Sequence, residues 1–244
     1  MKENFNSDTD AAGFQTLQVI SQADEFNKWM YQSFSNHLQG EILEIGSGIG
    51  NISKHVIADN HTLTLSDYND AYKNWLSKQF TSYENVKQVL QVDLLQPDFM
   101  IAYGHLKGKY DCIFLLNVIE HISDDLLAIK NCSFLLKPGA KLIVLAPAYR
   151  WLYCNLDKQL GHIRRYTLRS MEKIFLENNF RVYEKKYFNF SGIAGWLFFG
   201  KILRKKILGS EMSVFNKIVP LAKLIDKIIF NKAGLSVIVV GIKN

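Results

Sequence analysis

The segment "ILEIGSGIGNIS" at residues 42–53 contains the clearest candidate binding loop in the sequence. Gly46, Gly48 and Gly50 have the spacing G-x-G-x-G. A glycine-rich turn between a strand and a helix presents backbone N–H groups to a ligand at the start of the helix. A dinucleotide-binding loop would have a third glycine at Asn51, where it allows the helix to pack closely. The loop therefore favours a ligand other than a dinucleotide.

Three acidic residues stand near the ends of the expected strands. Glu44 precedes the first glycine by two residues, where its charge would repel a pyrophosphate but attract an ammonium group. Asp67 ends "LTLSD", where a carboxylate can accept from both hydroxyls of a ribose. Asp93 ends "QVD", where it can accept from the amino group of adenine. Since ligands bind at the carboxyl ends of strands in open α/β sheets, these acids favour S-adenosylmethionine, which has no phosphate, over a nicotinamide dinucleotide.

The elements that would position these residues alternate between buried strands and amphipathic helices. Apolar runs predict strands at residues 41–45, 62–66, 86–92, 110–117, 140–146, 181–187 and 236–242. A repeated strand–helix pattern with short connections links the first five of them. This order predicts an α/β fold with a doubly wound, mostly parallel sheet.

Taken together, these segments resemble a class I S-adenosylmethionine-dependent methyltransferase. The matching stretches are "LEIGSGIG", the acid of "LSDYN", "VDLL", "YDCIFLLNVIEHI" and "LKPGAKLIVLAP". The resemblance implies an enzyme with a Rossmann-like, seven-stranded sheet whose last strand is antiparallel, and S-adenosylmethionine as its cofactor. The cofactor-binding residues that it implies are Glu44, Gly46, Ser47, Gly48, Asn51, Asp67, Tyr68, Asp93, Leu94 and Asn117.

Two further stretches, "ADEFNKWMYQSF" and "DKQLGHIRRYT", resemble bacterial methyltransferases of the type 11/12 kind. Many of those lie near genes for glycosyl transfer or lipid-linked biosynthesis. The resemblance therefore implies a small acceptor in secondary metabolism or envelope biosynthesis, methylated on oxygen, nitrogen or carbon. The identity of the acceptor is open at this point.

Three residues are candidates for a general base that removes a proton from the acceptor. His121 follows the fourth strand, and Asp157 and His162 are close enough in sequence to pair as orienter and base. A structural hydrogen-bonding role is the alternative for each. The sequence shows no His, Cys, Asp or Glu cluster with the spacing of a metal site, so no metal is expected.

The stretch "GHIRRY" at residues 161–166 brings several hydrogen-bond donors together before a helix. An arginine there could read a carboxylate, phosphate or phenolate of the acceptor, or the stretch could simply start a helix capped by Thr167. Nearby aromatic residues could form a wall of the site or could pack internally. The expected substrate-binding residues are Trp29, Tyr31, Tyr149, Arg164, Arg165 and Tyr166.

The sequence predicts one domain over residues 1–244, with an N-terminal helical cap at 1–38 and an amphipathic helical insertion at 190–234 between the last two strands. The stretch "WLFFGKILRKKIL" joins an apolar patch to the basic residues Lys201, Arg204, Lys205 and Lys206. It could be a core helix, a lid, a dimer interface or a contact with an anionic membrane. A hydrophobic or lipid-linked acceptor suits this insertion, and the oligomeric state is open.

Charge and composition leave some partners open. The chain of 244 residues carries a formal net charge of +6, which permits nucleic acid, an anionic membrane or an acidic substrate. An RNA methyltransferase is not favoured, since the basic residues form no separate module. A partner-binding domain that keeps only the fold is a second alternative. Three cysteines without C-x-x-C spacing and no leader or membrane-spanning run predict a cytoplasmic protein, with peripheral contact at the inner face of the membrane.

Overall fold

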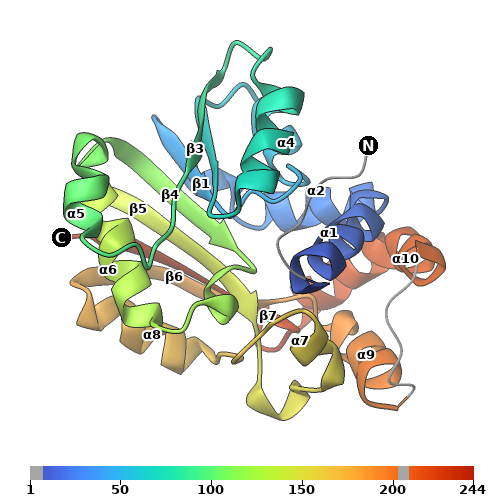
Figure 1. Ribbon diagram of the computed structural model, residues 1–244. Helices are drawn as coiled ribbons and strands as arrows, with labels where there is room; N and C mark the ends of the chain where they lie inside the picture. The colour runs from blue at the N-terminus through green and yellow to red at the C-terminus, as the bar shows by residue number, and fades with distance from the viewer. Residues whose placement is uncertain (1–7, 203–208) are drawn as a thin grey trace.

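One seven-stranded sheet organises the fold (Figure 1). The computed structural model describes residues 8–202 and 209–244. The strands are β1 (Ile42–Ile45), β2 (Leu63–Asp67), β3 (Val86–Gln91), β4 (Tyr110–Leu116), β5 (Leu136–Pro147), β6 (Phe180–Phe188) and β7 (Ser236–Lys243). Their order is β3-β2-β1-β4-β5-β7-β6. Strands β1 to β5 are parallel, whereas β7 runs antiparallel to β5 and β6. The predicted Rossmann-like sheet with an antiparallel last strand is confirmed.

The sheet is covered on both faces, because its central strands are apolar on both sides. In β1, the side chain of Ile42 packs in one core and that of Leu43 in the other. The core that contains Leu43 is completed by α5 (Phe99–Ala102), α6 (Asp125–Leu135) and α8 (Leu168–Glu177). The core that contains Ile42 is completed by α2 (Asp24–Gln32), α3 (Ser53–Ala58), α4 (Asp70–Phe80) and α10 (Gly209–Ile228). The result is a three-layer α/β/α arrangement.

Short helical turns lie in the connections around the sheet. They are η1 (Ser35–His37), η2 (Gly104–Leu106), η3 (Ile119–His121), η4 (Arg150–Leu152) and α7 (Asn155–Gln159). Turn η3 directly follows β4, and η4 and α7 follow β5. The loops after β4 and β5 therefore meet at the carboxyl edge of the sheet, where ligands bind in this architecture.

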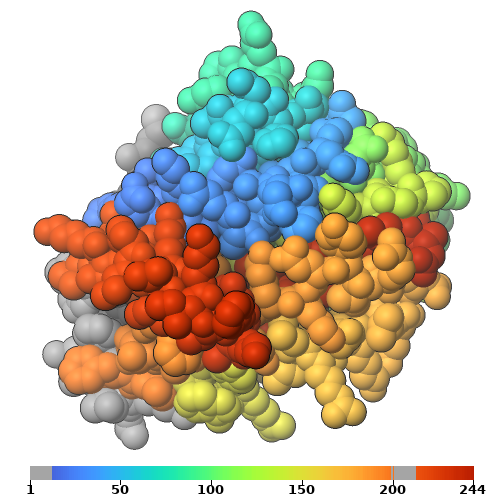
Figure 2. All heavy atoms as spheres, turned by 180° about the vertical axis from the view of Figure 1, so that it is seen from behind, coloured from blue at the N-terminus to red at the C-terminus, as the bar shows by residue number. Residues whose placement is uncertain are grey.

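The N-terminal helices pack against the helices that lie between β6 and β7. Helices α1 (Asp8–Ser21) and α2 precede β1, while α9 (Ser191–Trp196), the π-helical turn η5 (Leu197–Ile202) and α10 lie between β6 and β7. The rings of Phe26 on α2 and Phe215 on α10 are 5.4 Å apart. Figure 2 shows α10, in red-orange, beside the blue N-terminal segment. The predicted helical insertion between the last two strands is thus present.

Two observations concern the predicted contact with a membrane. Within residues 8–202 and 209–244, no helix has the length and apolar character needed to cross a bilayer. The predicted basic cluster of Lys201, Arg204, Lys205 and Lys206 lies outside the side chains that the structure describes. A role for that cluster stays a prediction.

Candidate functional site

The glycine loop after β1 adopts a conformation that depends on glycine. Gly46 and Gly48 have φ angles of 71° and 56°, in the left-handed region. A Cβ atom at Gly46 would collide with the side chain of Val118, so the loop also packs closely against the segment after β4. This close packing places the glycine loop and the β4 loop side by side at the carboxyl edge of the sheet.

Asp67 at the end of β2 holds the glycine loop through backbone groups. Its two carboxylate oxygens accept from the N–H of Gly48 and the N–H of Asn69, each at 3.0 Å. Ser47 adds a second link, because its N–H donates to the carbonyl of Ser66 at 2.9 Å. The predicted ribose acceptor is therefore buried and fixed beside the loop, as a preorganised binding residue should be.

Glu44 lies beneath this loop and is almost completely buried. Burial raises the pKa of its carboxyl to about 7, and the nearby Asp67 charge acts in the same direction. The hydroxyl of Ser53 donates to it at 2.5 Å, which ties β1 to the first residue of α3. A cationic group bound above the loop would favour the ionised form of Glu44.

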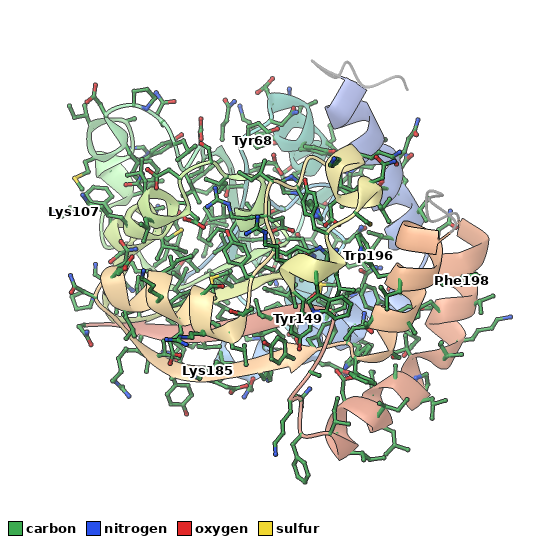
Figure 3. The ribbon with its side chains drawn as sticks, turned by 90° about the horizontal axis from the view of Figure 1, so that it is seen from below. Tyr68, Lys107, Tyr149, Lys185, Trp196 and Phe198 are labelled. Carbon is green, nitrogen blue, oxygen red and sulfur yellow. The ribbon has the colours of Figure 1, made fainter. Side chains whose placement is uncertain are left out.

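The remaining predicted cofactor residues occupy the same edge, with different contacts. One carboxylate oxygen of Asp93 accepts from the N–H of Leu95 at 2.8 Å, and Leu94 beside it is buried. Tyr68 is 60% exposed next to Asp67, and it is labelled in Figure 3. Asn117 has a positive φ of 54° and an N–H that donates to the carbonyl of Leu145 at 2.8 Å.

Helix α1 reaches the glycine loop, a contact that the sequence did not reveal. The side-chain amide of Asn51 donates to the carbonyl of Leu17 at 2.9 Å. The side chain of Leu17 lies where a Cβ atom on Gly48 would point, at 2.9 Å. The side-chain amide of Asn51 therefore ties the loop to α1, and a contact of Asn51 with the cofactor stays a prediction. The apolar spacing of Phe14 and Leu17 is the sequence signal that could have indicated this contact.

The loops after β4 and β5 bring titratable residues together. His162 approaches Asp157 through Nδ1 at 2.9 Å and Glu120 through Nε2 at 3.8 Å. The rings of His121 and His162 are 4.8 Å apart and nearly perpendicular. The three candidate base residues therefore meet in one cluster. Glu120 joins them, although the sequence alone did not distinguish it as a site residue.

Charges within this cluster constrain the role of each member. Burial alone would raise the pKa of Asp157, but His162, Arg165 and the N–H of Cys154 hold it below its usual value. Asp157 is thus an ionised orienting group rather than a base. Burial raises the pKa of Glu120 to about 7. His121 keeps an exposed face, yet its crowded surroundings and the neighbouring His162 lower its pKa. His121 therefore suits a neutral imidazole at physiological pH.

Comparison with known proteins decides the family. A family model described as a methyltransferase domain matches residues 20–185. The chain belongs to this methyltransferase family. The predicted recognition as a class I S-adenosylmethionine-dependent methyltransferase, and therefore as an enzyme, is confirmed.

Solved structures show that the methyltransferase shares its fold with S-adenosylmethionine-dependent enzymes. One is a SAM-dependent methyltransferase from Archaeoglobus fulgidus, with a TM-score of 0.61, 14% identity and coverage of 90% of this chain and 94% of that chain. Another is phosphoethanolamine N-methyltransferase 2 of Haemonchus contortus in complex with S-adenosyl-L-methionine, with a TM-score of 0.57, 16% identity and coverage of 89% and 52%. The family match and this ligand-bound neighbour support S-adenosylmethionine as the cofactor.

Curated relatives match the methyltransferase over a short segment. Lovastatin diketide synthase lovF of Aspergillus terreus is 29% identical over 113 residues, which are 44% of this chain and 4% of that protein. The chain thus spans a small fraction of the length of the curated relatives that it matches. The similarity covers only this segment and does not extend to the activities of the full-length relatives.

The two predicted substrate-reading arginines brace the methyltransferase internally. Arg165 donates from Nε to Asp157 at 2.8 Å and from a terminal nitrogen to the carbonyl of Ala148 at 2.9 Å, and its guanidinium stacks on Trp196. Its side chain is only 1% exposed, so these donors serve partners within the protein, and a contact with an acceptor stays a prediction. Arg164 pairs with Asp125 at 2.7 Å and keeps some exposure. The sequence could not distinguish these internal partners from a ligand.

The predicted aromatic residues separate into two places. Tyr149 stacks on Trp151 and on Tyr187, with ring centroids 5.8 and 5.0 Å apart, and Figure 3 shows it in the same part of the methyltransferase as Trp196. Tyr166 is buried and donates to Asp125 at 2.9 Å, so it braces the same loop.

Trp29 and Tyr31 lie in the core on the other face of the sheet, which contradicts their grouping with Tyr149. Trp29 packs on Phe188 with ring centroids 4.5 Å apart. Tyr31 donates to Asp59 at 2.5 Å. Both belong to the amphipathic helix α2, whose apolar face packs against the sheet and α10. The physical reason for the error is that a sequence shows an apolar face but not its partner.

Proposed function

We propose that the methyltransferase transfers a methyl group from S-adenosylmethionine to a small, hydrophobic or lipid-linked acceptor that binds beside Glu120, His121 and His162. The observation that carries this proposal is the position of that cluster. Glu120 and His121 follow β4 near Asn117, and His162 lies in the loop after β5, on the edge where the glycine loop and Asp67 lie. Donor and acceptor would therefore meet between the loops after β1 and β4.

The cofactor supplies an electrophilic sulfonium methyl, and the protein contributes alignment and a place for a proton. Asp67 and the glycine loop would hold the donor, while the segment after β4 would hold the acceptor. Fixing two reactants in line lowers the barrier by avoiding entropy loss in the reaction step. The histidine–carboxylate cluster would assist the acceptor in losing its proton, an effect worth roughly 10²–10⁴-fold in rate.

An apolar acceptor suits the surroundings of the cluster. Trp151 is 56% exposed and continues the stack formed by Tyr149 and Tyr187. Similarity to polyketide synthases and fold likeness to a phosphoethanolamine N-methyltransferase support a small-molecule acceptor. The atom that receives the methyl group would be oxygen, nitrogen or carbon.

Helix α10 adds an apolar stripe that supports contact with a lipid surface. Its exposed apolar residues recur every three or four positions, so they share one side of the helix. They are Val214, Ile218, Leu221, Leu224 and Ile228, which are 44–64% exposed. Lys217 and Lys227 lie on the same helix and are exposed. An apolar stripe with neighbouring lysines matches an anionic membrane and would give access to a lipid-linked acceptor.

The test is an acceptor search with isotopically labelled S-adenosylmethionine. The protein would be incubated with fractionated polar and lipid extracts, and labelled products identified by mass spectrometry. We expect label in a small or lipid-linked product, and less label with an Asp67→Ala variant at a limiting cofactor concentration. Label found only in RNA or protein would overturn the acceptor class, and absence of label with every fraction despite cofactor binding would overturn catalysis.

A further inference from the structure

The Glu120 carboxyl group is the most unusual polar group in the described part of the chain. Its side chain is completely buried, and neither of its oxygens makes a hydrogen bond among the described residues. Leaving a buried polar group without a partner is unfavourable, and more so when the group is charged. Buried carboxylates in folded proteins are therefore paired, protonated or bound to a cation.

The nearest groups to Glu120 are ligand atoms of the kind that transition metals bind. One atom each from Glu120, His121 and His162 lie within 4.8 Å of one another. Nε2 of His162 lies 3.8 Å from Oε1 of Glu120. Ligand atoms around a tetrahedral zinc ion are about 3.3 Å apart, as its bond lengths require. Small side-chain rotations would bring the three atoms to that separation.

His162 is already oriented as a metal-binding histidine would be. Its Nδ1 lies 2.9 Å from a carboxylate oxygen of Asp157, which accepts a hydrogen bond, so that nitrogen carries the proton. The lone pair of His162 then lies on Nε2, the atom that approaches Glu120. A carboxylate that fixes the tautomer of a ligating histidine is the usual outer partner in zinc sites. Arg165 at 2.8 Å and the N–H of Cys154 at 2.9 Å fix Asp157 in turn.

We propose that Glu120, His121 and His162 bind one divalent transition-metal cation, with zinc as the best match. Two imidazoles and one carboxylate are a ligand set that zinc accepts, and three protein ligands leave one position open. His121 keeps an exposed face, through which the cation can enter. The expectation of no metal rested on spacing in the sequence, but the fold joins ligands from the loops after β4 and β5.

The open position gives the cation a role in the proposed reaction. It would hold an oxygen or nitrogen of the acceptor, and a bound cation lowers the pKa of such a group. With the cation on Nε2, His162 would act as a ligand rather than as the proton acceptor. This role rests on the proposed function, whereas the cation site itself does not.

The test measures metal binding separately from methyl transfer. Tag-free protein treated with a chelator and dialysed would be titrated with Zn²⁺ by calorimetry, and with Co²⁺ by visible absorption spectroscopy. We expect one equivalent of each metal to bind and cobalt d–d bands typical of nitrogen and oxygen ligands. Glu120→Gln and His162→Ala should each weaken binding at least tenfold, while His105→Ala on the exposed turn η2 should not change it.

Circular dichroism and S-adenosylhomocysteine affinity would show that the variants are folded. No stoichiometric binding by the unaltered protein, or equal affinity in Glu120→Gln and His162→Ala, would overturn the site. Metal binding without methyl transfer would leave the site standing while the proposed function failed. If the protein bound no metal and still transferred methyl groups after chelation, the metal site would be overturned while the proposed function would stand.

Discussion

We call the glycine loop with Asp67 the proposed cofactor side, and the loops after β4 and β5 the proposed acceptor side, of the carboxyl edge. The two are built differently. On the cofactor side, backbone N–H groups of Gly48 and Asn69 hold Asp67, and the residues involved lie close to consecutive strands. On the acceptor side, side chains hold the loops together, as in the Arg165–Asp157 and Arg164–Asp125 pairs. A site held by backbone groups keeps its geometry when residues other than its glycines and acids are substituted. A site held by side chains loses part of its geometry whenever one of those side chains is replaced. The two sides should therefore fail in different ways.

The largest effect should follow loss of His162. We expect His162→Ala to lower kcat by roughly 10²–10⁴-fold, because the acceptor loses the group that assists proton removal. The affinity for S-adenosylhomocysteine should stay within about twofold, since His162 belongs to the acceptor side. Steady-state kinetics and calorimetry would measure the two quantities. If the affinity for S-adenosylhomocysteine fell by as large a factor as kcat, His162 would not belong to the acceptor side alone.

Arg165→Ala should mainly destabilise the fold. It would leave the buried Asp157 carboxylate without its cation, which costs about 3–5 kcal/mol of unfolding free energy. Arg164→Ala removes a partly exposed pair and should cost no more than about 1 kcal/mol. Urea unfolding monitored by circular dichroism compares the two. If Arg165→Ala stayed fully stable but lost activity, a direct acceptor contact would have to be reconsidered.

Asp67→Ala tests the cofactor side. The variant removes the acceptor predicted for the ribose hydroxyls, and the loss should be about 1–3 kcal/mol of binding free energy, or roughly 5- to 150-fold in Kd. Asp70→Ala, at the exposed start of α4, is the matched control and should bind normally. Calorimetry with S-adenosylhomocysteine gives both values. Unchanged affinity in Asp67→Ala would place the cofactor elsewhere.

Leu221→Glu tests the proposed lipid contact of α10. Placing a charge in the apolar stripe should reduce binding to anionic vesicles by about fivefold, given roughly 1 kcal/mol per charge near such a surface. Leu176→Glu is the control, because Leu176 on α8 is 57% exposed and Leu221 is 59% exposed. Vesicle sedimentation at low and high salt measures the partition. Equal binding by both variants would mean that α10 does not touch the lipid.

The smallest effect concerns Glu44 and pH. The folded-state pKa of Glu44 is raised from 4.5 to about 7, so its contribution to stability is full below 4.5 and declines as pH rises towards 7. Glu44→Gln does not titrate, and it should gain stability relative to the unaltered protein between about pH 5 and 8. Denaturant unfolding at several pH values without cofactor measures the difference. A constant difference across that range would contradict the raised pKa.

The sequence predicted the sheet well because periodicity is a local property. The run 110–117 was assigned as a buried strand and the structure has β4 at Tyr110–Leu116. The acids at Asp67 and Asp93 were placed correctly at strand ends, since each position follows from its own strand. Their ligand contacts remain predictions. The positions of the residues on the cofactor side could thus be predicted from short, continuous stretches of sequence.

The acceptor side was less predictable because its contacts join distant residues. The ion pair of Arg164 with Asp125 and that of Arg165 with Asp157 cannot be seen in the dense run "GHIRRY". The burial of Glu120 depends on the loop after β5. In that loop, the N–H of Ile163 donates to the backbone carbonyl of Glu120 at 2.9 Å. Trp29 was predicted to bind substrate together with Tyr149, although the two lie on different faces of the sheet. The sequence of an amphipathic helix does not show which neighbour its apolar side will contact.

The contact of Leu17 with the glycine loop affects how fast a ligand leaves the site rather than how tightly it binds. A ligand held against Gly48 shares its boundary with helix α1, which is tied to Asn51 by a single hydrogen bond at 2.9 Å. Release of the product S-adenosylhomocysteine would then be coupled to the opening of that helix. Terminal helices open more readily than central ones. The residence time of the product, and with it the turnover rate of the enzyme, would be set by how firmly the first helix is fastened.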